Sequence, residues 1–275
     1  MKKALLASRR YVVLIVLAIL WITPAISVIF TSVKSQQDFF SGMGLFEWPA
    51  QIHWENFTRA LFEANLLLYM RNSFLISMWK VPLGILVAAL AAFAITRLEV
   101  KAPRAIFIYF LIGMMVPFQV ALVPLNAFFV RHGLIDSFFG LTYVYIAFGL
   151  PFAILVLRGF FSAIPKELDE AAYIDGCGRL RMFFTIILPL AKPALASLFI
   201  LDFLATWNEY ILASVLIRDR SRQLVTAGLM NFVGQYGTQF GMLSAGVLIN
   251  VIPIMIVYLL LQKHFVQGMA GAVKG

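Results

Sequence analysis

Charged residues and cysteine are both scarce in this 275-residue sequence. Only 13% of the residues are charged, against about a quarter in soluble globular proteins. So low a share excludes a soluble domain as the main part of the chain. Cys177 is the one cysteine, so no internal disulfide bond can form. Its place in a predicted cytosolic loop fits a reducing compartment.

Motifs for nucleotide, metal and nucleophile chemistry are also missing. The sequence holds no Gly-x-x-x-x-Gly-Lys-Ser/Thr loop for phosphate, no His-Glu-x-x-His pair for zinc and no Gly-x-Ser-x-Gly nucleophile elbow. His53, His132 and His264 lie far apart in the sequence and form no ligand set. We therefore expect no catalytic residue, no metal site and no cofactor bound by this chain.

Apolar residues dominate what remains. They make up 62% of the chain, and the mean hydropathy is +0.91, as expected for an integral membrane protein. The net charge of +9 does not require nucleic acid as a partner, because lysine and arginine gather at the cytosolic ends of membrane spans. The lipid bilayer is the expected partner, and no nucleic acid is expected.

Six apolar runs are long enough to cross a bilayer as helices of about 20 residues. The expected spans are residues 11–30, 72–96, 105–129, 138–157, 188–212 and 242–262. Their length favours helices over the shorter strands of a membrane barrel. For the first run a cleaved signal peptide is the alternative, but the run exceeds a typical signal core, so we favour an uncleaved anchor. The expected fold is an all-α integral membrane protein with one membrane domain, residues 1–275.

Basic residues indicate the orientation of these spans. If the N-terminus is inside, the cytosolic segments hold fourteen lysines and arginines and the outer segments hold seven. This distribution favours both termini inside, with a cytosolic tail at 263–275. The outer loop from Arg218 to Arg222 runs against the trend.

Prolines lie in or at the ends of several spans. They are Pro24, Pro82, Pro117, Pro124, Pro151, Pro189, Pro193 and Pro253. Proline removes a backbone hydrogen bond and kinks a helix, so these positions predict broken spans that line a pathway. The alternative is that membrane helices simply tolerate proline more often.

The cytosolic loop 162–181 predicts a short helix of about three turns. Pro165 suits the first turn, and Gly176 suits a left-handed stop after Asp175. Three-and-four spacing places Glu167, Glu170, Ala171 and Ile174 on one face, and Leu168, Ala172 and Asp175 on the adjacent stripe. On physical grounds alone, this helix is either a docking surface for another protein or an ordinary interfacial helix.

The same loop carries a specific resemblance. Its order of Glu170-Ala171-Ala172, Gly176, Ile186 and Leu188-Pro189 resembles the EAA loop of permease subunits in binding-protein-dependent ABC importers. Cys177 stands where the extended motif usually has alanine. The resemblance covers nearly the whole chain. The proline spacing, the Trp207-Asn208-Glu209-Tyr210 segment and the tail Gly271 to Gly275 resemble the carbohydrate-uptake group, and within it the maltose-type six-span subunit.

This resemblance implies a transport subunit with the ABC type I importer permease fold, not an enzyme. The implied partners are a second homologous permease in a heterodimer, two cytosolic ATPase subunits that use ATP and magnesium, and an extracytoplasmic solute-binding protein. The implied location is the cytoplasmic membrane of a bacterium or archaeon. ATPase coupling is assigned to Glu167, Glu170, Ala171, Ala172, Ile174, Asp175 and Gly176.

The implied cargo is a sugar or a sugar-like solute. Another small polar solute is the alternative, and a self-sufficient secondary transporter or channel is the weaker one. An intramembrane enzyme does not fit, because Asp202 and Glu209 would lie about 10 Å apart along one helix, which suits neither an aspartyl pair nor a glycosidase.

Charges inside the predicted spans are the candidates for the transport pathway. An ionised side chain at mid-membrane costs about 2.5 to 3.5 kcal/mol. Lys80 and Asp202 lie at comparable depth, so we expect an ion pair between them. The alternative is that Lys80 extends alone toward the interface while Asp202 faces water.

Four residues late in the fifth span form a second group of candidates. Trp207, Asn208 and Glu209 combine a flat ring with polar groups suited to a sugar. The alternative is an ordinary interfacial aromatic belt, above all for Tyr210.

Overall fold

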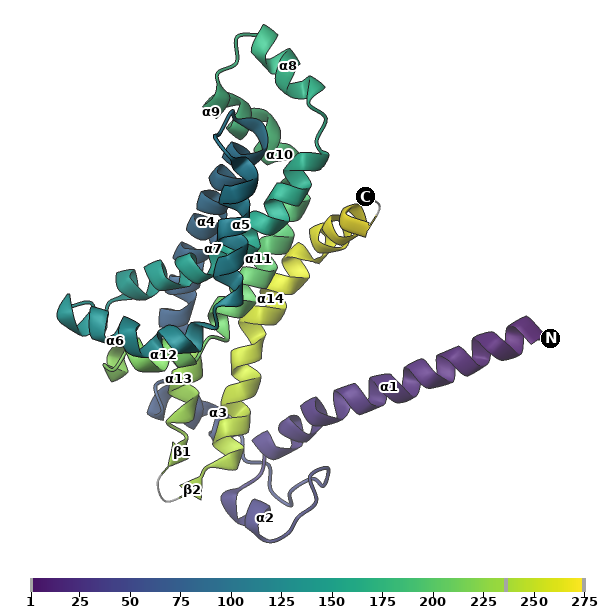
Figure 1. The fold of residues 1–275 in the computed structure, drawn as a ribbon. Coiled ribbons are helices and arrows are strands. Elements are labelled where there is room, and N and C mark those ends of the chain that lie inside the picture. The colour runs from purple at the N-terminus through teal and green to yellow at the C-terminus, as the bar shows by residue number, and fades with distance from the viewer. Residues whose placement is uncertain (1, 235–236, 274–275) are drawn as a thin grey trace. The chain divides into compact units, whose positions relative to one another are not determined.

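The computed structural model describes residues 2–234 and 237–273, which form an almost entirely helical chain (Figure 1). Among them, four helices have the length and apolar character to cross a membrane, and two bent helix pairs raise the number to as many as six. The four are α1 (Lys2–Ser32), α4 (Leu66–Arg97), α7 (Phe138–Ala163) and α14 (Phe240–Val273). This agrees with the six predicted spans.

The first bent pair replaces the single helix predicted over residues 105–129. It comprises α5 (Pro103–Met115), the 3-10 helix η2 (Phe118–Ala121) and α6 (Leu122–Arg131). The two arms meet at 81°. One continuous helix is wrong here because Pro117 has no backbone N–H and its ring disfavours helical backbone at the preceding residue. Val116 is accordingly extended, with φ −84° and ψ 113°.

The second bent pair lies in the predicted fifth span. It runs through α9 (Arg179–Met182), the π-helix η3 (Phe183–Ile187), α10 (Leu188–Leu190) and α11 (Lys192–Trp207), with a bend of 77°. The predicted boundaries 188–212 are wrong at both ends. Helix already begins at Arg179, and the chain breaks after Trp207 before α12 (Ile211–Leu216) begins.

Proline therefore breaks only some of the helices. Pro117 and Pro193 stand at the two bends, and Pro193 occupies the first turn of α11, where a missing N–H costs nothing. The helices α1, α4, α7 and α14 continue through Pro24, Pro82, Pro151 and Pro253.

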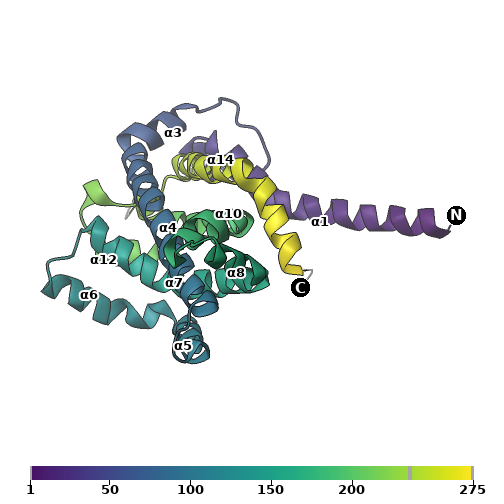
Figure 2. The same ribbon diagram turned by 90° about the horizontal axis from the view of Figure 1, so that it is seen from above.

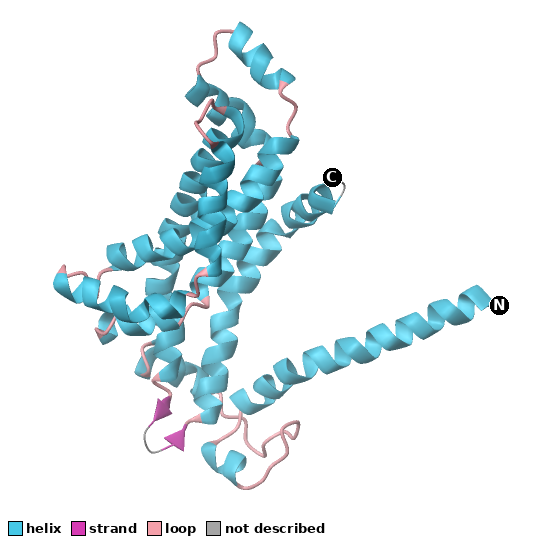
Figure 3. Ribbon diagram, viewed as in Figure 1, coloured by secondary structure: helices cyan, strands magenta, loops and turns pink. Residues whose placement is uncertain are grey.

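Short elements connect the long helices (Figure 3). They are α2 (Gln36–Phe40), α3 (Glu55–Thr58), the π-helix η1 (Arg59–Glu63), α8 (Glu167–Ile174), the 3-10 helix η4 (Arg220–Arg222), α13 (Val225–Met230), β1 (Val233–Gly234) and β2 (Gly237–Thr238). The two short strands pair antiparallel, with Val233 opposite Thr238.

One of two compact units contains residues Met1–Met70 and Ala227–Ile252. Within it, the segment after α1 is joined to the start of α14. The Phe39 and Phe240 rings stack with centroids 4.0 Å apart, and the amide of Asn56 donates to the carbonyls of Ser32 and Lys34. These contacts order the loop between α1 and α4 within this unit.

The second unit contains residues Arg71–Thr226 and Pro253–Gly275. In it α7 packs against α5 and α11, and α12 packs beside α6 (Figure 2). Buried residues of α6, α7 and α12, including Phe129, Leu141 and Leu216, form its apolar core at one end. The functional residues predicted from the sequence all lie in this unit.

Candidate functional site

The predicted docking segment folds as α8. Three carboxylates, those of Glu167, Asp169 and Glu170, lie in its first turn, where the helix dipole favours negative charge. At its C-terminus Gly176 adopts φ +72°. The Gly176 N–H donates to the Tyr173 carbonyl at 3.0 Å, and the Cys177 N–H donates to the Ala172 carbonyl at 2.8 Å. This is a Schellman stop, as the glycine predicted.

Most of the α8 residues assigned to coupling are exposed. Glu167, Glu170, Ala171, Ile174, Asp175 and Gly176 all have accessible side chains or backbone. Tyr173 and Ile174 are each 83% exposed, which is unusual for large apolar side chains outside a membrane span. In Figure 1 α8 lies beyond the end of α7.

Ala172 departs from this pattern. It is 4% exposed, so the prediction that it offers a contact surface to a partner is wrong. Its position explains the burial, because Ala172 follows Asp169 by three residues and shares its face of the helix. Asp169 is held against the rest of the unit, so this face of α8 points inward.

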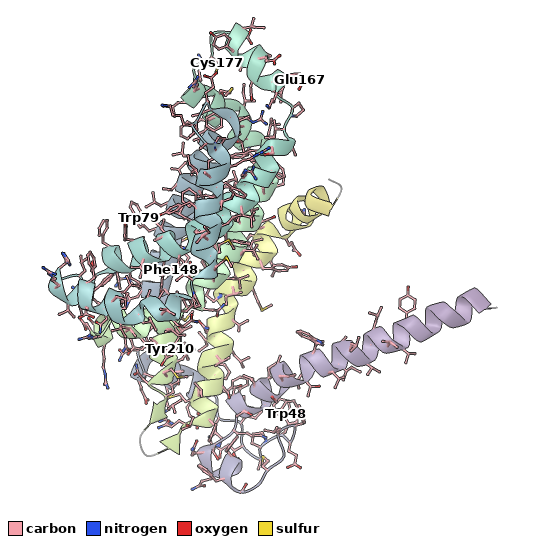
Figure 4. All side chains as sticks on the ribbon, in the orientation of Figure 1. Trp48, Trp79, Phe148, Glu167, Cys177 and Tyr210 are labelled. Atoms are coloured by element: carbon pink, nitrogen blue, oxygen red, sulfur yellow. The ribbon has the colours of Figure 1, made fainter. Side chains whose placement is uncertain are left out.

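A small cavity lies beside the C-terminal end of α8. Its volume is about 240 Å³, and it is lined by Ala172, Asp175, Cys177, Arg181, Thr185 and Ile186. Figure 4 shows Glu167 and Cys177 flanking α8. Cys177 is half-buried here. The cavity thus lies between the Gly176–Cys177 turn and residues of α9 and η3.

Arg97 is a functional candidate that the sequence analysis missed. It ends α4, its side chain is 2% exposed, and its Nη1 lies 2.6 Å from Asp169 Oδ2. Its Nη2 donates to the carbonyls of Phe161 and Ile164, both at 2.5 Å. In the sequence Arg97 counted only as one more basic residue at a span end. No spacing rule links it to Asp169, which lies 72 positions later.

The predicted ion pair between Lys80 and Asp202 is confirmed. Lys80 Nζ contacts Asp202 Oδ1, and it also donates to the Thr206 hydroxyl at 3.2 Å. The Lys80 side chain is 4% exposed and that of Asp202 is 22% exposed. The alternative in which Lys80 extends alone to the interface is therefore wrong.

Glycines on α7 and on α4 lie beside this ion pair, and an added Cβ would meet it at ordinary contact distance. A Cβ on Gly149 of α7 would lie 3.5 Å from Lys80 Nζ and 3.6 Å from Asp202 Oδ1, and one on Gly84 would lie 3.9 Å from Asp202 Oδ2. The pair thus joins α4 to α11 in a space that α7 closes on one side. Thr206 adds a hydroxyl that donates to the Asp202 carbonyl at 2.7 Å.

Glu209 has a clear structural task at the break between α11 and α12. Its carboxylate accepts from the backbone N–H groups of Leu212 and Ala213, at 2.8 and 3.0 Å, and from the Tyr145 hydroxyl at 2.6 Å. It therefore satisfies the unpaired N–H groups at the start of α12. The need for a cap explains this carboxylate independently of any solute.

The neighbours of Glu209 differ in exposure. Trp207 is 1% exposed and stacks on Phe203 with ring centroids 5.5 Å apart, so the prediction that it lines the pathway is wrong. An aromatic ring near a helix end can pack in the core or against a sugar, and the sequence alone does not distinguish the two roles. Asn208 is exposed, with its amide donating to the Leu204 carbonyl at 3.0 Å, and Tyr210 is 42% exposed.

Sequence comparison identifies close relatives of this chain. The family model described as "Binding-protein-dependent transport system inner membrane component" matches residues 80–271, most of the chain. The probable ABC transporter permease protein YurM of Bacillus subtilis is 35% identical, with 96% of this chain and 86% of YurM covered. The trehalose/maltose transport system permease protein MalG of Thermococcus litoralis is also 35% identical, with 95% of this chain and 94% of MalG covered.

Comparison with solved structures shows the same fold. The chain superposes on a subunit of a bacterial ABC transporter involved in the import of the acidic polysaccharide alginate, with a TM-score of 0.83. The match covers 96% of this chain and 98% of that one at 22% identity. At this level of identity the similarity establishes the type of fold and nothing more about the site.

Proposed function

This chain belongs to the family of binding-protein-dependent transport system inner membrane components, and from that premise we propose that it forms half of the membrane pathway of an ATP-driven importer for a sugar or sugar-like solute. The other half is a second, related permease subunit. An extracytoplasmic binding protein delivers the solute, and two cytosolic ATPase subunits drive the transport.

The names of the relatives support a carbohydrate cargo. MalG of T. litoralis is named for trehalose and maltose, and it matches this chain over almost the full length of both. Within the site, the exposed Asn208 and the partly exposed Asp202 offer amide and carboxylate groups to hydroxyls. We assign these two residues, with Lys80 holding Asp202 in place, to the pathway.

The exposed surface of α8 is the single observation that carries the coupling role. It combines two large apolar side chains, Tyr173 and Ile174, with the carboxylates of Glu167 and Glu170. An exposed apolar group rimmed by charge fits a protein partner better than water. The sequence lacks a phosphate-binding loop, so we place ATP and magnesium in the partner subunits and no enzymatic activity in this chain.

The exposed surface of α1 supports a membrane location with a second subunit. The apolar window of α1 has 0% of its residues buried within this chain. Such a surface requires lipid or another membrane subunit. The positive-inside bias supports a cytosolic position for both termini and for α8, and relatives in Bacillus subtilis and Thermococcus litoralis support the cytoplasmic membrane of a bacterium or archaeon.

Transport follows from alternating access in this arrangement. Closure of the ATPase pair displaces α8, and the bent spans carry that movement to the gates. To move such an equilibrium from 1:99 to 99:1, roughly 5.5 kcal/mol of differential binding is required. The contact between α8 and the ATPases must therefore persist in both states.

Two substitutions, one in α8 and one in the turn that ends it, test this function. Glu170→Lys reverses the charge offered to a partner, and Gly176→Pro forbids φ +72°. We expect both variants to insert normally, to lose the co-purifying ATPase subunits and to lose uptake. Glu99→Lys is the matched control, because Glu99 is an exposed carboxylate in another loop on the same side. Normal uptake by either α8 variant would refute the coupling role.

A further inference from the structure

Arg97 joins three elements at the cytosolic end of the second unit. Its guanidinium, at the end of α4, contacts the Asp169 carboxylate on α8 and two carbonyls at the end of α7. The last carbonyls of a helix have no partners within the helix. Arginine can serve them and a carboxylate together, because its planar fork carries five N–H donors.

The contact between Arg97 and Asp169 is largely buried, and burial makes each charge depend on the other. The Arg97 side chain is 2% exposed, and a buried charge is stable only when it is paired and hydrogen-bonded. Asp169 Oδ1 is itself buried, without a hydrogen-bond partner among the described residues. Loss of Arg97 would leave an unpaired carboxylate at the base of α8. The contact therefore fixes the inward face of α8.

The connection to α4 is the informative part of this geometry. Helix α7 leads into α8 along the backbone, so it follows any movement of α8. Helix α4 is far from α8 in sequence and meets it through the Arg97 to Asp169 ion pair. Seventeen residues earlier, about 25 Å along the same helix, α4 carries Lys80, which pairs with Asp202 on α11.

We propose that Arg97 is a positioning residue that makes α8 move as one body with the cytosolic ends of α4 and α7. A displacement of α8 thereby reaches α4, the span that holds Lys80, and not only α7 and the α9–α11 span, to which α8 is covalently linked. This inference rests on the proposed docking role of α8. It names a residue through which docking at α8 moves a third span, α4.

The test uses the complete importer in lipid vesicles, with its ATPase subunits and binding protein. Three variants separate the parts of the contact: Arg97→Gln removes the charge, Arg97→Lys keeps the charge without the fork, and Asp169→Asn removes the partner's charge. Lys101→Gln and Glu99→Gln are the matched controls, because both side chains are exposed in the adjacent loop. The readouts are bound ATPase subunits, ATP hydrolysis and solute transported per ATP.

We expect the Arg97→Gln and Asp169→Asn importers to keep their ATPase subunits and to hydrolyse ATP. Solute transported per ATP should fall about tenfold, within the range typical of coupling between sites. Arg97→Lys should fall less, and the controls should match the unmodified importer. If Arg97→Gln fails to insert, Asp169→Asn decides the question.

Two results would overturn the proposal. One is an unchanged amount of solute per ATP in the variants. The other is a parallel loss of assembly and hydrolysis at an unchanged ratio, which a purely structural role would produce. If instead Glu170→Lys leaves the ATPase subunits bound and uptake normal, the docking role of α8 itself has failed, and the proposal for Arg97 falls with it.

Discussion

At the scale of single residues, the buried charges follow one physical rule. Lys80 and Arg97 both lie on α4, both are almost inaccessible, and each contacts a carboxylate from a distant part of the chain. A lone charge in either place would cost several kcal/mol, and the carboxylate partner offsets that cost. The carboxylates are the part-exposed members of both pairs, so the lysine and arginine are the ones that require the contact.

A double-mutant cycle measures the first of these pairs. We expect Lys80→Ala and Asp202→Ala each to destabilise the protein by about 3 kcal/mol, the lower end for breaking a buried pair, because Asp202 is 22% exposed. The double variant should lose clearly less than the sum, because neither charge is then left unpaired. Thermal unfolding in detergent and uptake are the measurements. If the two losses are additive, the Lys80 to Asp202 ion pair does not contribute to stability.

The two pairs differ in how far sequence could predict them. Lys80 and Asp202 were predictable because each is a rare charge inside an apolar run and both lie at similar depth. Arg97 and Asp169 were not, because each belongs to a polar segment in which charge needs no explanation. Trp207 was assigned wrongly for a related reason, since its ring packs on Phe203 in the core instead of facing a solute.

At the scale of elements, close approach between helices depends on individual glycines. Gly228 of α13 faces Tyr69 of α4 in the first unit, and a Cβ there would lie 2.1 Å from Tyr69 Cδ2. Tyr69 is 4% exposed and has little room to move. By contrast, Gly159 lies in α7 with nothing within 4 Å of its Cβ position among the described atoms.

These two glycines form a matched pair of substitutions. Gly228→Ala should destabilise the protein by about 1 to 3 kcal/mol, because an added methyl group overpacks the contact with Tyr69. Gly159→Ala should stabilise it by about 0.5 to 1 kcal/mol, because alanine restricts the unfolded chain and fits a helix. Thermal unfolding of both variants in one detergent checks the opposite signs. An equal shift in the same direction would contradict this explanation.

The short helix α2 predicts a dependence on pH. Hydrogen bonds from the Ser35 hydroxyl at 2.7 Å and its backbone N–H at 2.9 Å hold the pKa of Asp38 below its ordinary 3.8. A lowered pKa means that the ionised carboxylate stabilises the folded state, fully above pH 3.8, and that this contribution is lost as the pH falls through the folded-state value.

Hydrogen exchange in the segment around α2 measures this effect. Protection, corrected for the intrinsic rate, should drop in acid below pH 3.8 in the unmodified protein. In Asp38→Asn it should already be lower at neutral pH and should show no such drop. If both proteins respond to acid in the same way, the hydrogen bonds between Ser35 and Asp38 do not stabilise α2.

Element boundaries were the part of the fold that sequence predicted least well. Helix content, the short helix α8 and its glycine stop followed from apolar run length and turn chemistry, and the structure agrees with them. The breaks at Val116 and after Trp207 lie inside apolar runs, where hydropathy does not change. Proline marks possible breaks, but it interrupts the helix at Pro117 and not at Pro82, so only packing decides.

At the scale of the whole molecule, the loop that opposed the positive-inside trend has a structural explanation. The carboxylate of Asp136 accepts from the backbone N–H groups of Arg218 and Asp219, and Arg222 donates to the Asp136 carbonyl at 2.6 Å. Arg218 also donates to the Asn126 amide oxygen at 2.9 Å. Arg218 and Arg222 thus fasten the loop to α6 and to the segment after it. These contacts explain the arginines of the loop without reference to the membrane, and the orientation inferred from the other basic residues stays a prediction.

Cys177 has a practical value that its chemistry alone does not suggest. It is the sole thiol of the chain, and it sits in the wall of the cavity behind α8, next to the turn that ends the helix. A maleimide fluorophore would therefore attach at a single position without any engineered cysteine. We expect its emission to change when the proposed ATPase subunits bind α8, which would report that contact in real time without a mutation.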